Sequence, residues 1–152
     1  MLGAGAMLAA SGTDAAPTLG EDGLLREPWF LASFLDLPDD LATAVAAGKR
    51  LAVLWELKGC PFCHRLHHKT LANPEVERFV RTAFDVVQLD IIGARPVVAI
   101  DGTRLPEKVL AQRDGVAGTP VMQVFEGGAE TVRLTGFLPP PDFLAKLRSN
   151  RS

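Results

Sequence analysis

Residues 51–63 read LAVLWELKGCPFC and carry the strongest structural signal in this chain. Residues 51–57 have the length and the apolar character of a buried strand, and Lys58 and Gly59 end it. From Cys60 onward the pattern predicts a helix, because a proline in the first turn is compatible with helix formation. The sequence therefore places a pair of cysteines where a strand ends and a helix begins.

Cys60 and Cys63 are the only two cysteines of the chain, and two residues separate them. The N-terminus of a helix carries a partial positive charge and unpaired N–H groups, which stabilise a thiolate. Cys60 is therefore the predicted nucleophile that attacks a disulfide, and Cys63, one turn further on, is the predicted resolving thiol. Such a pair requires no dissociable cofactor, because the two sulfurs themselves hold the exchanged electrons.

The same residues leave a second class of function open, a metal- or haem-binding module. His64, His67 and His68 are the only histidines, and together with the cysteines they could bind zinc or copper. A tetrahedral site normally takes ligands from two elements, however, so we expect no metal site on this one helix. The motif CPFCH at 60–64 also matches the attachment signature of c-type haem, but the buried strand that runs into it disfavours an open haem pocket.

The remaining patterns predict an α/β chain with a mixed sheet and helices on both faces. An Asn-Pro pair at 73–74 starts a helix, and the apolar stretch 84–92 is a second buried strand, so that a parallel βαβ unit results. A helix, a hairpin and a final helix follow at 106–115, at 120–136 and after the prolines 139–141. Upstream we expect an N-terminal helical extension, made of the apolar segment from Pro28 and a helix that follows Asp40 and ends at Gly48.

Length and composition limit the classes of function that this chain can have. The chain has 152 residues, of which 47% are hydrophobic, and a formal net charge of −2, which suits one globular domain. This charge balance argues against nucleic-acid binding through a broad basic surface. No apolar stretch reaches the roughly 18 residues that cross a bilayer. No dimerisation segment is evident, and we expect a monomer.

Three regions are expected along the chain. Residues 1–16 are small and apolar and resemble the remnant of a signal peptide, whose basic start is missing because no positive charge precedes Arg26. Residues 17–27 are polar and rich in turn-forming residues, and we interpret them as a linker. Residues 28–152 form the predicted domain. A signal peptide would direct the protein to the periplasm.

With CPFC after a strand, the βαβ unit and a Thr-Pro pair before the hairpin, the chain resembles the thioredoxin superfamily over about residues 49–148. The resemblance implies a thioredoxin fold and a thiol–disulfide oxidoreductase. It implies a cis bond between Thr119 and Pro120, which would face the cysteine pair, although the residues alone indicate an ordinary trans turn. It also implies that Pro61, Phe62, Thr119 and Pro120 contact the substrate.

Three longer segments are similar to exported thioredoxin-like proteins encoded with bacterial sulfur-oxidation (Sox) systems. They read GCPFCHRLHHKTLANPEVERFV, FDVVQLDI and GVAGTPVMQVFEGG, and they begin at residues 59, 84 and 115. The similarity implies a periplasmic reductase of protein disulfides or mixed disulfides. It further implies a Sox carrier protein as partner and a membrane thiol transporter as electron donor.

Two features depart from ordinary cytosolic thioredoxins. The buried aspartate that assists their resolving thiol matches Leu54 here, so that role is vacant or is taken by Glu56. A Glu56 buried near Cys63 would suit proton transfer, whereas a solvated Glu56 would pair with Lys58, and both interpretations remain open. The insert at 93–105 either shapes partner recognition or is a tolerated surface loop.

Overall fold

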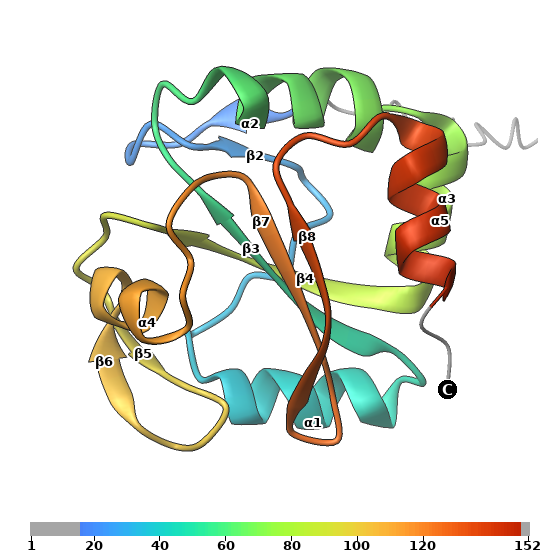
Figure 1. The fold of residues 1–152 in the computed structure, drawn as a ribbon. Helices are drawn as coiled ribbons and strands as arrows, with labels where there is room; N and C mark the ends of the chain where they lie inside the picture. The colour runs from blue at the N-terminus through green and yellow to red at the C-terminus, as the bar shows by residue number, and fades with distance from the viewer. Residues whose placement is uncertain (1–15, 150–152) are drawn as a thin grey trace, which may run out of the picture.

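The computed structural model describes residues 16–149, and its centre is a four-stranded sheet (Figure 1). The strands lie in the order β4 (Phe84–Asp90), β3 (Arg50–Glu56), β7 (Val121–Glu126) and β8 (Ala129–Thr135). β3 pairs in parallel with β4 and antiparallel with β7, and β7 pairs antiparallel with β8. The mixed sheet and the parallel βαβ unit predicted from the sequence are therefore confirmed. The expected signal-peptide remnant lies, except for its last residue, outside the described residues.

β3 is apolar along nearly its whole length because both faces of the sheet are covered. Leu51, Val53 and Trp55 pack into one hydrophobic core, and Ala52 and Leu54 pack into the other. All five side chains are fully buried. A strand with one solvated face would alternate apolar and polar residues, so the continuous apolar run is the mark of a central strand.

Helices close the two cores on opposite faces of the sheet (Figure 1). The π-helical segment η1 (Leu66–Leu71) packs with α3 (Pro74–Ala83) and α5 (Pro140–Ser149) over one face. Helices α1 (Leu37–Ala46) and α4 (Glu107–Arg113) pack over the other. In the part of the chain that the structure describes, no helix is long and apolar enough to cross a membrane.

Local sequence signals begin the helices of the βαβ unit where they are expected. The side chain of Asn73 accepts hydrogen bonds from the N–H groups of Glu75 and the next residue, and Pro74 occupies the first turn of α3. The helix predicted from Cys60 onward is present as α2 (Pro61–Arg65). Its continuation is wound as the π-helix η1, a geometry for which the sequence carries no signal and which is frequent at functional sites.

The segment interpreted as a linker is folded against the domain. Within residues 17–27, the strands β1 (Thr18–Leu19) and β2 (Leu25–Arg26) form an antiparallel hairpin. Its turn-forming residues make the hairpin's own turn, where Gly23 adopts a φ of 79°. Leu24 is buried, so this stretch contributes apolar surface to the fold and is not a polar connection.

The expected helical extension is helical only in α1. Residues 28–36 form no helix and run beside the edge strand β4, where the Leu31 N–H donates to the Val86 carbonyl at 2.8 Å. The helix begins earlier than the sequence indicated, because the carboxylate of Asp36 caps it by accepting a hydrogen bond from the Asp39 N–H.

The insert at 93–105 is an ordered part of the molecule. It contains β5 (Pro96–Val98), which pairs with β6 (Arg104–Pro106) in a second small hairpin. The Val98 N–H donates to the Leu35 carbonyl at 2.9 Å, so the insert is bonded to the segment before α1. A role in partner recognition stays a prediction.

Candidate active site

The cysteine pair lies where the central strand β3 ends and α2 begins. Cys60 is the N-cap of α2, and its sulfur accepts a hydrogen bond from the Cys63 N–H at 3.1 Å. The two residues form a disulfide with their Cα atoms 5.2 Å apart, within the usual range for such a bond. The spacing therefore does what the sequence predicts: it brings both sulfurs to the positive end of one helix.

The two sulfurs have different surroundings. Cys63 is only 5% exposed and faces the interior, whereas Cys60 is partly exposed. The Thr119 hydroxyl donates to the Cys60 sulfur at 3.2 Å, and the Thr119 carbonyl oxygen lies 3.7 Å from the same atom. Cys60 is thus the sulfur that a partner can reach.

Thr119 and Pro120 precede β7, and the bond between them is cis, as the resemblance implied. Their loop brings the hydroxyl and the carbonyl of Thr119 to Cys60. Between the two cysteines in the sequence, Pro61 is exposed and Phe62 is 55% exposed. All four residues lie around or beside the disulfide, and their contact with a substrate stays a prediction.

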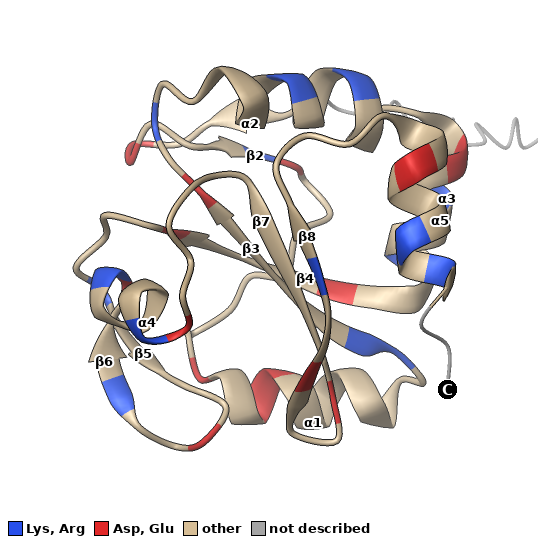
Figure 2. Cartoon of the chain, in the orientation of Figure 1, with Lys and Arg blue, Asp and Glu red and all other residues tan. Residues whose placement is uncertain are grey.

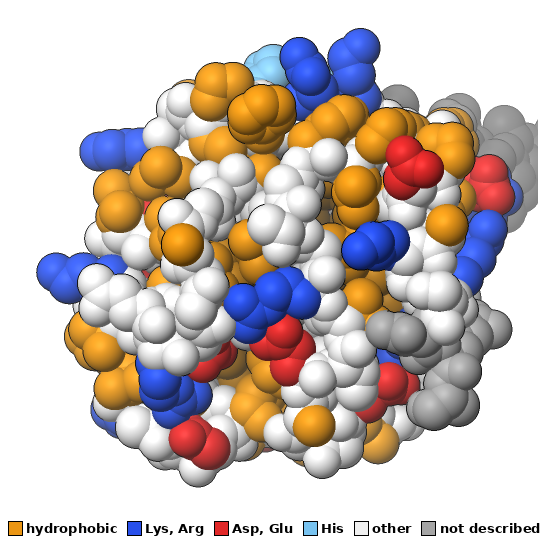
Figure 3. All heavy atoms as spheres, in the orientation of Figure 1, with side chains coloured by type: hydrophobic (Ala, Val, Ile, Leu, Met, Phe, Trp, Pro, Cys, Tyr) orange, Lys and Arg blue, Asp and Glu red, His pale blue; other side chains and the backbone are white. Residues whose placement is uncertain are grey.

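The helical segment that carries the cysteines is positively charged on its surface. Between residues 57 and 72 the chain contains Lys58, Arg65 and Lys69 and no acidic residue (Figure 2). Basic and hydrophobic side chains gather along this edge of the molecule in the space-filling view (Figure 3). A positive surface beside Cys60 favours the thiolate that would attack a disulfide.

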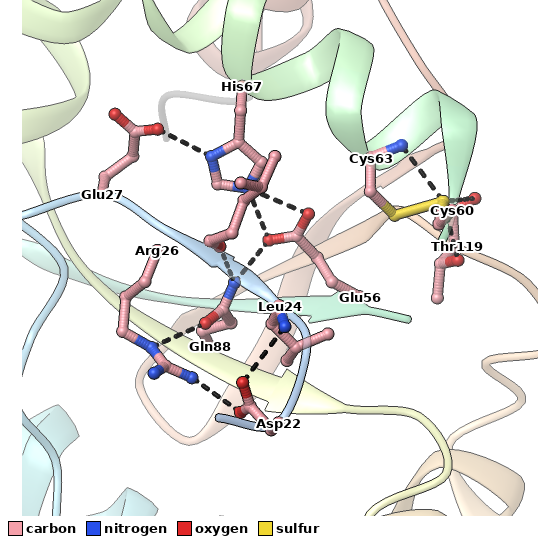
Figure 4. Close-up of polar contacts among 11 residues, drawn as sticks. Asp22, Leu24, Arg26, Glu27, Glu56, Cys60, Cys63, His67, Gln88 and Thr119 are labelled. Carbon is pink, nitrogen blue, oxygen red and sulfur yellow. Dashed lines mark hydrogen bonds and ion pairs between the residues drawn. A yellow bond between two sulfur atoms is a disulfide. The ribbon is translucent and has the colours of Figure 1, made fainter. Parts of the chain in front are cut away.

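Glu56, the last residue of β3, is buried, with an exposed fraction of 1%. Its carboxylate accepts a hydrogen bond from the Gln88 side-chain amide at 2.7 Å, and its two oxygens lie 2.8 and 3.0 Å from Nε2 of His67 (Figure 4). Of the two interpretations of this residue, the structure therefore selects the buried carboxylate over the solvated partner of Lys58.

A cavity of about 470 Å³ connects Glu56 with the disulfide. Glu56, Leu57, Cys60 and Cys63 line it from the side of β3 and α2, and Leu24 lines it from the N-terminal hairpin. Leucines make up much of its lining, and a space of this size has room for water beside the polar groups of Glu56 and His64. Glu56 and the buried sulfur of Cys63 thus open into one shared space.

His67 is fully buried between two carboxylates, a place for which its sequence position gave no role in thiol chemistry. Its Nδ1 lies 2.7 Å from Glu27, and its Nε2 faces Glu56 from the opposite edge of the ring (Figure 4). Burial acts to lower the pKa of His67, but the hydrogen bonds and charges of Glu27 and Glu56 outweigh it and raise this pKa to about 9. His67 follows the buried Cys63 by four residues, and that helical spacing could have marked it as inward-facing.

No sequence pattern marked Glu27 as a buried residue, because it belongs to the stretch interpreted as a linker. Its carboxylate is 6% exposed. The hairpin that delivers it is fixed to β4 by Gln88, whose amide donates to the Leu25 carbonyl at 2.6 Å and whose oxygen accepts from Arg26 at 2.9 Å. Arg26 in turn pairs with Asp22 at 2.8 Å.

The other two histidines lie on the surface. His64 and His68 are exposed, and their ring centroids are 4.1 Å apart. Among residues 16–149 no group of three or more His, Cys, Asp and Glu side chains is arranged to hold a metal ion.

Comparison with known proteins agrees with this geometry. A family model described as a thioredoxin-like domain matches residues 37–150. Among solved structures, a thioredoxin from Thermus thermophilus is 30% identical, with a TM-score of 0.57 over 75% of this chain and 82% of that one. The C-terminal domain of Neisseria meningitidis DsbD in its oxidised form is 23% identical, with a TM-score of 0.60 over 80% of this chain and 99% of that one. A search of curated protein sequences found no match.

Proposed function

The chain belongs to the thioredoxin-like family, and from that premise we propose that it is a thiol–disulfide oxidoreductase. The observation that carries the proposal is the disulfide between Cys60 and Cys63 at the entrance of α2, with one reachable and one buried sulfur. The two cysteines supply the electrons, and the role of nucleophile falls to Cys60 because it is the more exposed of the two.

In the reduced protein, the Cys60 thiolate attacks a disulfide of the substrate. A mixed disulfide forms, and the other substrate sulfur leaves as a thiolate. The N–H of Cys63 and the hydroxyl of Thr119 face the Cys60 sulfur, so both are placed to stabilise its negative charge before the attack.

The second step belongs to Cys63. Its thiol gives its proton, by way of water in the shared cavity, to the carboxylate of Glu56, and the resulting thiolate attacks the Cys60 sulfur. The disulfide between Cys60 and Cys63 forms, the substrate sulfur leaves as a thiolate, and that thiolate takes up a proton. Two electrons have then passed from the cysteine pair to the substrate.

We further propose that the physiological reaction is the reduction of protein disulfides or mixed disulfides in the periplasm, linked to sulfur oxidation. The similarity of the three sequence segments that begin at residues 59, 84 and 115 to Sox-associated proteins supports this. A Sox carrier protein would be the substrate, and a membrane thiol transporter would return electrons to the cysteine pair.

Thiol counting and cysteine variants test the proposed function. Mild oxidation should remove both thiols together, and dithiothreitol should restore both. The wild-type protein should catalyse the reduction of insulin disulfides by dithiothreitol, Cys60→Ser should abolish this activity, and Cys63→Ser should accumulate mixed disulfides that mass spectrometry identifies. Full activity of Cys60→Ser would contradict the proposal, as would cysteines that are held by a metal or by haem in the purified protein.

Trapping in a periplasmic extract tests the physiological partner. A Cys63→Ser protein should capture a Sox carrier protein through Cys60. Capture of other proteins alone would contradict the link to sulfur oxidation and leave the oxidoreductase chemistry intact.

A further inference from the structure

A segment outside the matched family region completes the active site. The family model begins at residue 37, yet residues 19 and 23–25 form one wall of the cavity that reaches Glu56 and the disulfide. Directly after the hairpin, Glu27 contacts His67 inside the protein. The N-terminal hairpin therefore contributes both a wall and a buried charge to the site.

The contacts of His67 fix how many protons the three side chains hold. Both ring nitrogens lie within 2.7–3.0 Å of a carboxylate oxygen. A neutral imidazole donates from only one nitrogen, so its other lone pair would face a carboxylate oxygen without a proton between them. The contacts therefore favour an imidazolium between two carboxylates, in line with the raised pKa of His67. The three side chains together then hold one proton more than a neutral histidine with two carboxylates would.

We propose that Glu27, His67 and Glu56 form one proton-holding array, in which Glu27 and His67 are positioning residues that keep Glu56 ready to take the proton of Cys63. This inference rests on the proposed thiol–disulfide chemistry. Glu56 is the member that shares the cavity with Cys63, and the other two act through it.

Glu27 has two effects in this array. It holds Nδ1 of the ring, so that Nε2 points at Glu56, and it offsets the positive charge of His67. An uncompensated imidazolium beside Glu56 would hold the carboxylate in its anionic form and make it a poorer proton acceptor. With Glu27 present, Glu56 can accept the proton of Cys63 while His67 stays charged.

The other groups around the ring are neutral or lie one contact further out. The ring of Phe30 lies 5.8 Å from that of His67, centroid to centroid. Gln88, from β4, donates to Glu56, and beyond it Arg26 pairs with Asp22. Among residues 16–149, the two carboxylates are therefore the charged groups in direct contact with His67.

A direct titration tests the array in the complete chain. The imidazole of His67 is followed by NMR in the oxidised protein, and its pKa should lie about 9 in the wild type. In Glu27→Gln this pKa should fall by about 1–3 units, because one of the two carboxylates that stabilise the imidazolium is lost. Glu21→Gln, at an exposed position of the same hairpin, is the matched control and should leave the pKa unchanged. A wild-type His67 that titrates at or below pH 6.5 would overturn the inference, whether or not the variant folds.

Single-turnover kinetics then tests the effect on sulfur chemistry. The reduced protein is mixed with 5,5′-dithiobis(2-nitrobenzoate), and the release of the first and the second aromatic thiolate is followed across pH. Glu27→Gln should slow the second release about tenfold and shift its pH profile, with the first release unchanged. An unaltered second step in this variant would overturn the inference. Failure of the wild type to release either thiolate would instead contradict the proposed function, so the two failures are distinguishable.

Discussion

The two sides of the disulfide between Cys60 and Cys63 differ in charge and in exposure. On the side of Cys60, a hydroxyl and a carbonyl from the loop before β7 face a partly exposed sulfur. On the side of Cys63, a buried sulfur shares a cavity with Glu56, behind which His67 and Glu27 lie. The groups that touch the Cys60 sulfur are neutral and lie beside an exposed basic surface, whereas the groups behind Cys63 are buried charged side chains.

The two sides suit different steps of disulfide exchange. Capture of a partner requires an accessible thiolate and neutral groups that can pair with a second chain. Resolution requires that a buried thiol lose a proton, for which a nearby carboxylate is suited. Substitutions on the two sides should therefore slow different steps.

The largest effect is expected on the buried side, for Glu56→Gln. This variant keeps the shape of the side chain but removes the proton acceptor, so the attack by Cys63 should slow by about 10²-fold while the attack by Cys60 changes little. Rapid mixing with a small disulfide, and mass spectrometry of the mixed disulfide that accumulates, measure the two steps.

Glu107→Gln is the matched control for this prediction, because Glu107 is equally buried but binds Arg95 in another part of the molecule. It should leave both steps unchanged. If Glu56→Gln slowed the two steps equally, the assignment of the buried side to resolution would be wrong.

The second effect concerns stability. The pKa of His67 is raised from 6.5 to about 9 by its carboxylate partners, which outweigh the lowering by burial. Because the folded protein binds this proton more tightly than the unfolded chain, the stabilisation is complete below pH 6.5 and is lost as the pH rises through 9. The loss should amount to about 3 kcal/mol in the free energy of unfolding.

Urea denaturation of the oxidised protein at pH 6 and pH 9.5 measures this loss. His67→Gln should flatten the dependence, whereas His68→Gln, an exposed position on the same helical segment, should retain it. If the free energy of unfolding depended on pH equally in the wild type and in His67→Gln, the charge of His67 would not be the group that stabilises the folded protein.

The smallest effect is expected on the exposed side, for Thr119→Val. The change removes the hydroxyl that donates to the Cys60 sulfur and keeps the volume of the side chain. A single hydrogen bond contributes about 1 kcal/mol, so alkylation of reduced Cys60 by iodoacetamide at neutral pH should slow by about fivefold. The rate of resolution by Cys63 should not change. If Thr119→Val slowed resolution by Cys63 and left alkylation of Cys60 unchanged, the assignment of the two steps to the two sides would be wrong.

Much of the fold and the cysteine pair were predictable, because their signals are local. The apolar run of β3, the cysteine spacing and the Asn-Pro start of α3 each depend on neighbouring residues and on the geometry of one element. The cis bond before Pro120 was implied only by the resemblance, since the residues alone indicated a trans turn. The location of the protein and its partner remain predictions.

The rest could not be predicted, because it depends on residues far apart in the chain. The strands of the N-terminal hairpin have two residues each, too few for a periodic pattern, and Gln88 of β4 holds the hairpin in place. The sequence left two interpretations of Glu56 open, and contacts with Gln88 and His67 decided between them.

A strand that meets a helix at two cysteines could be predicted from neighbouring residues, because hydrophobic periodicity and helix capping act over a few positions. The groups behind the buried Cys63 could not, because they come together only when distant segments fold. Glu27, Glu56 and His67 are stable in the interior because they form hydrogen bonds and ion pairs with one another. These contacts require three separate segments of the chain to fold together.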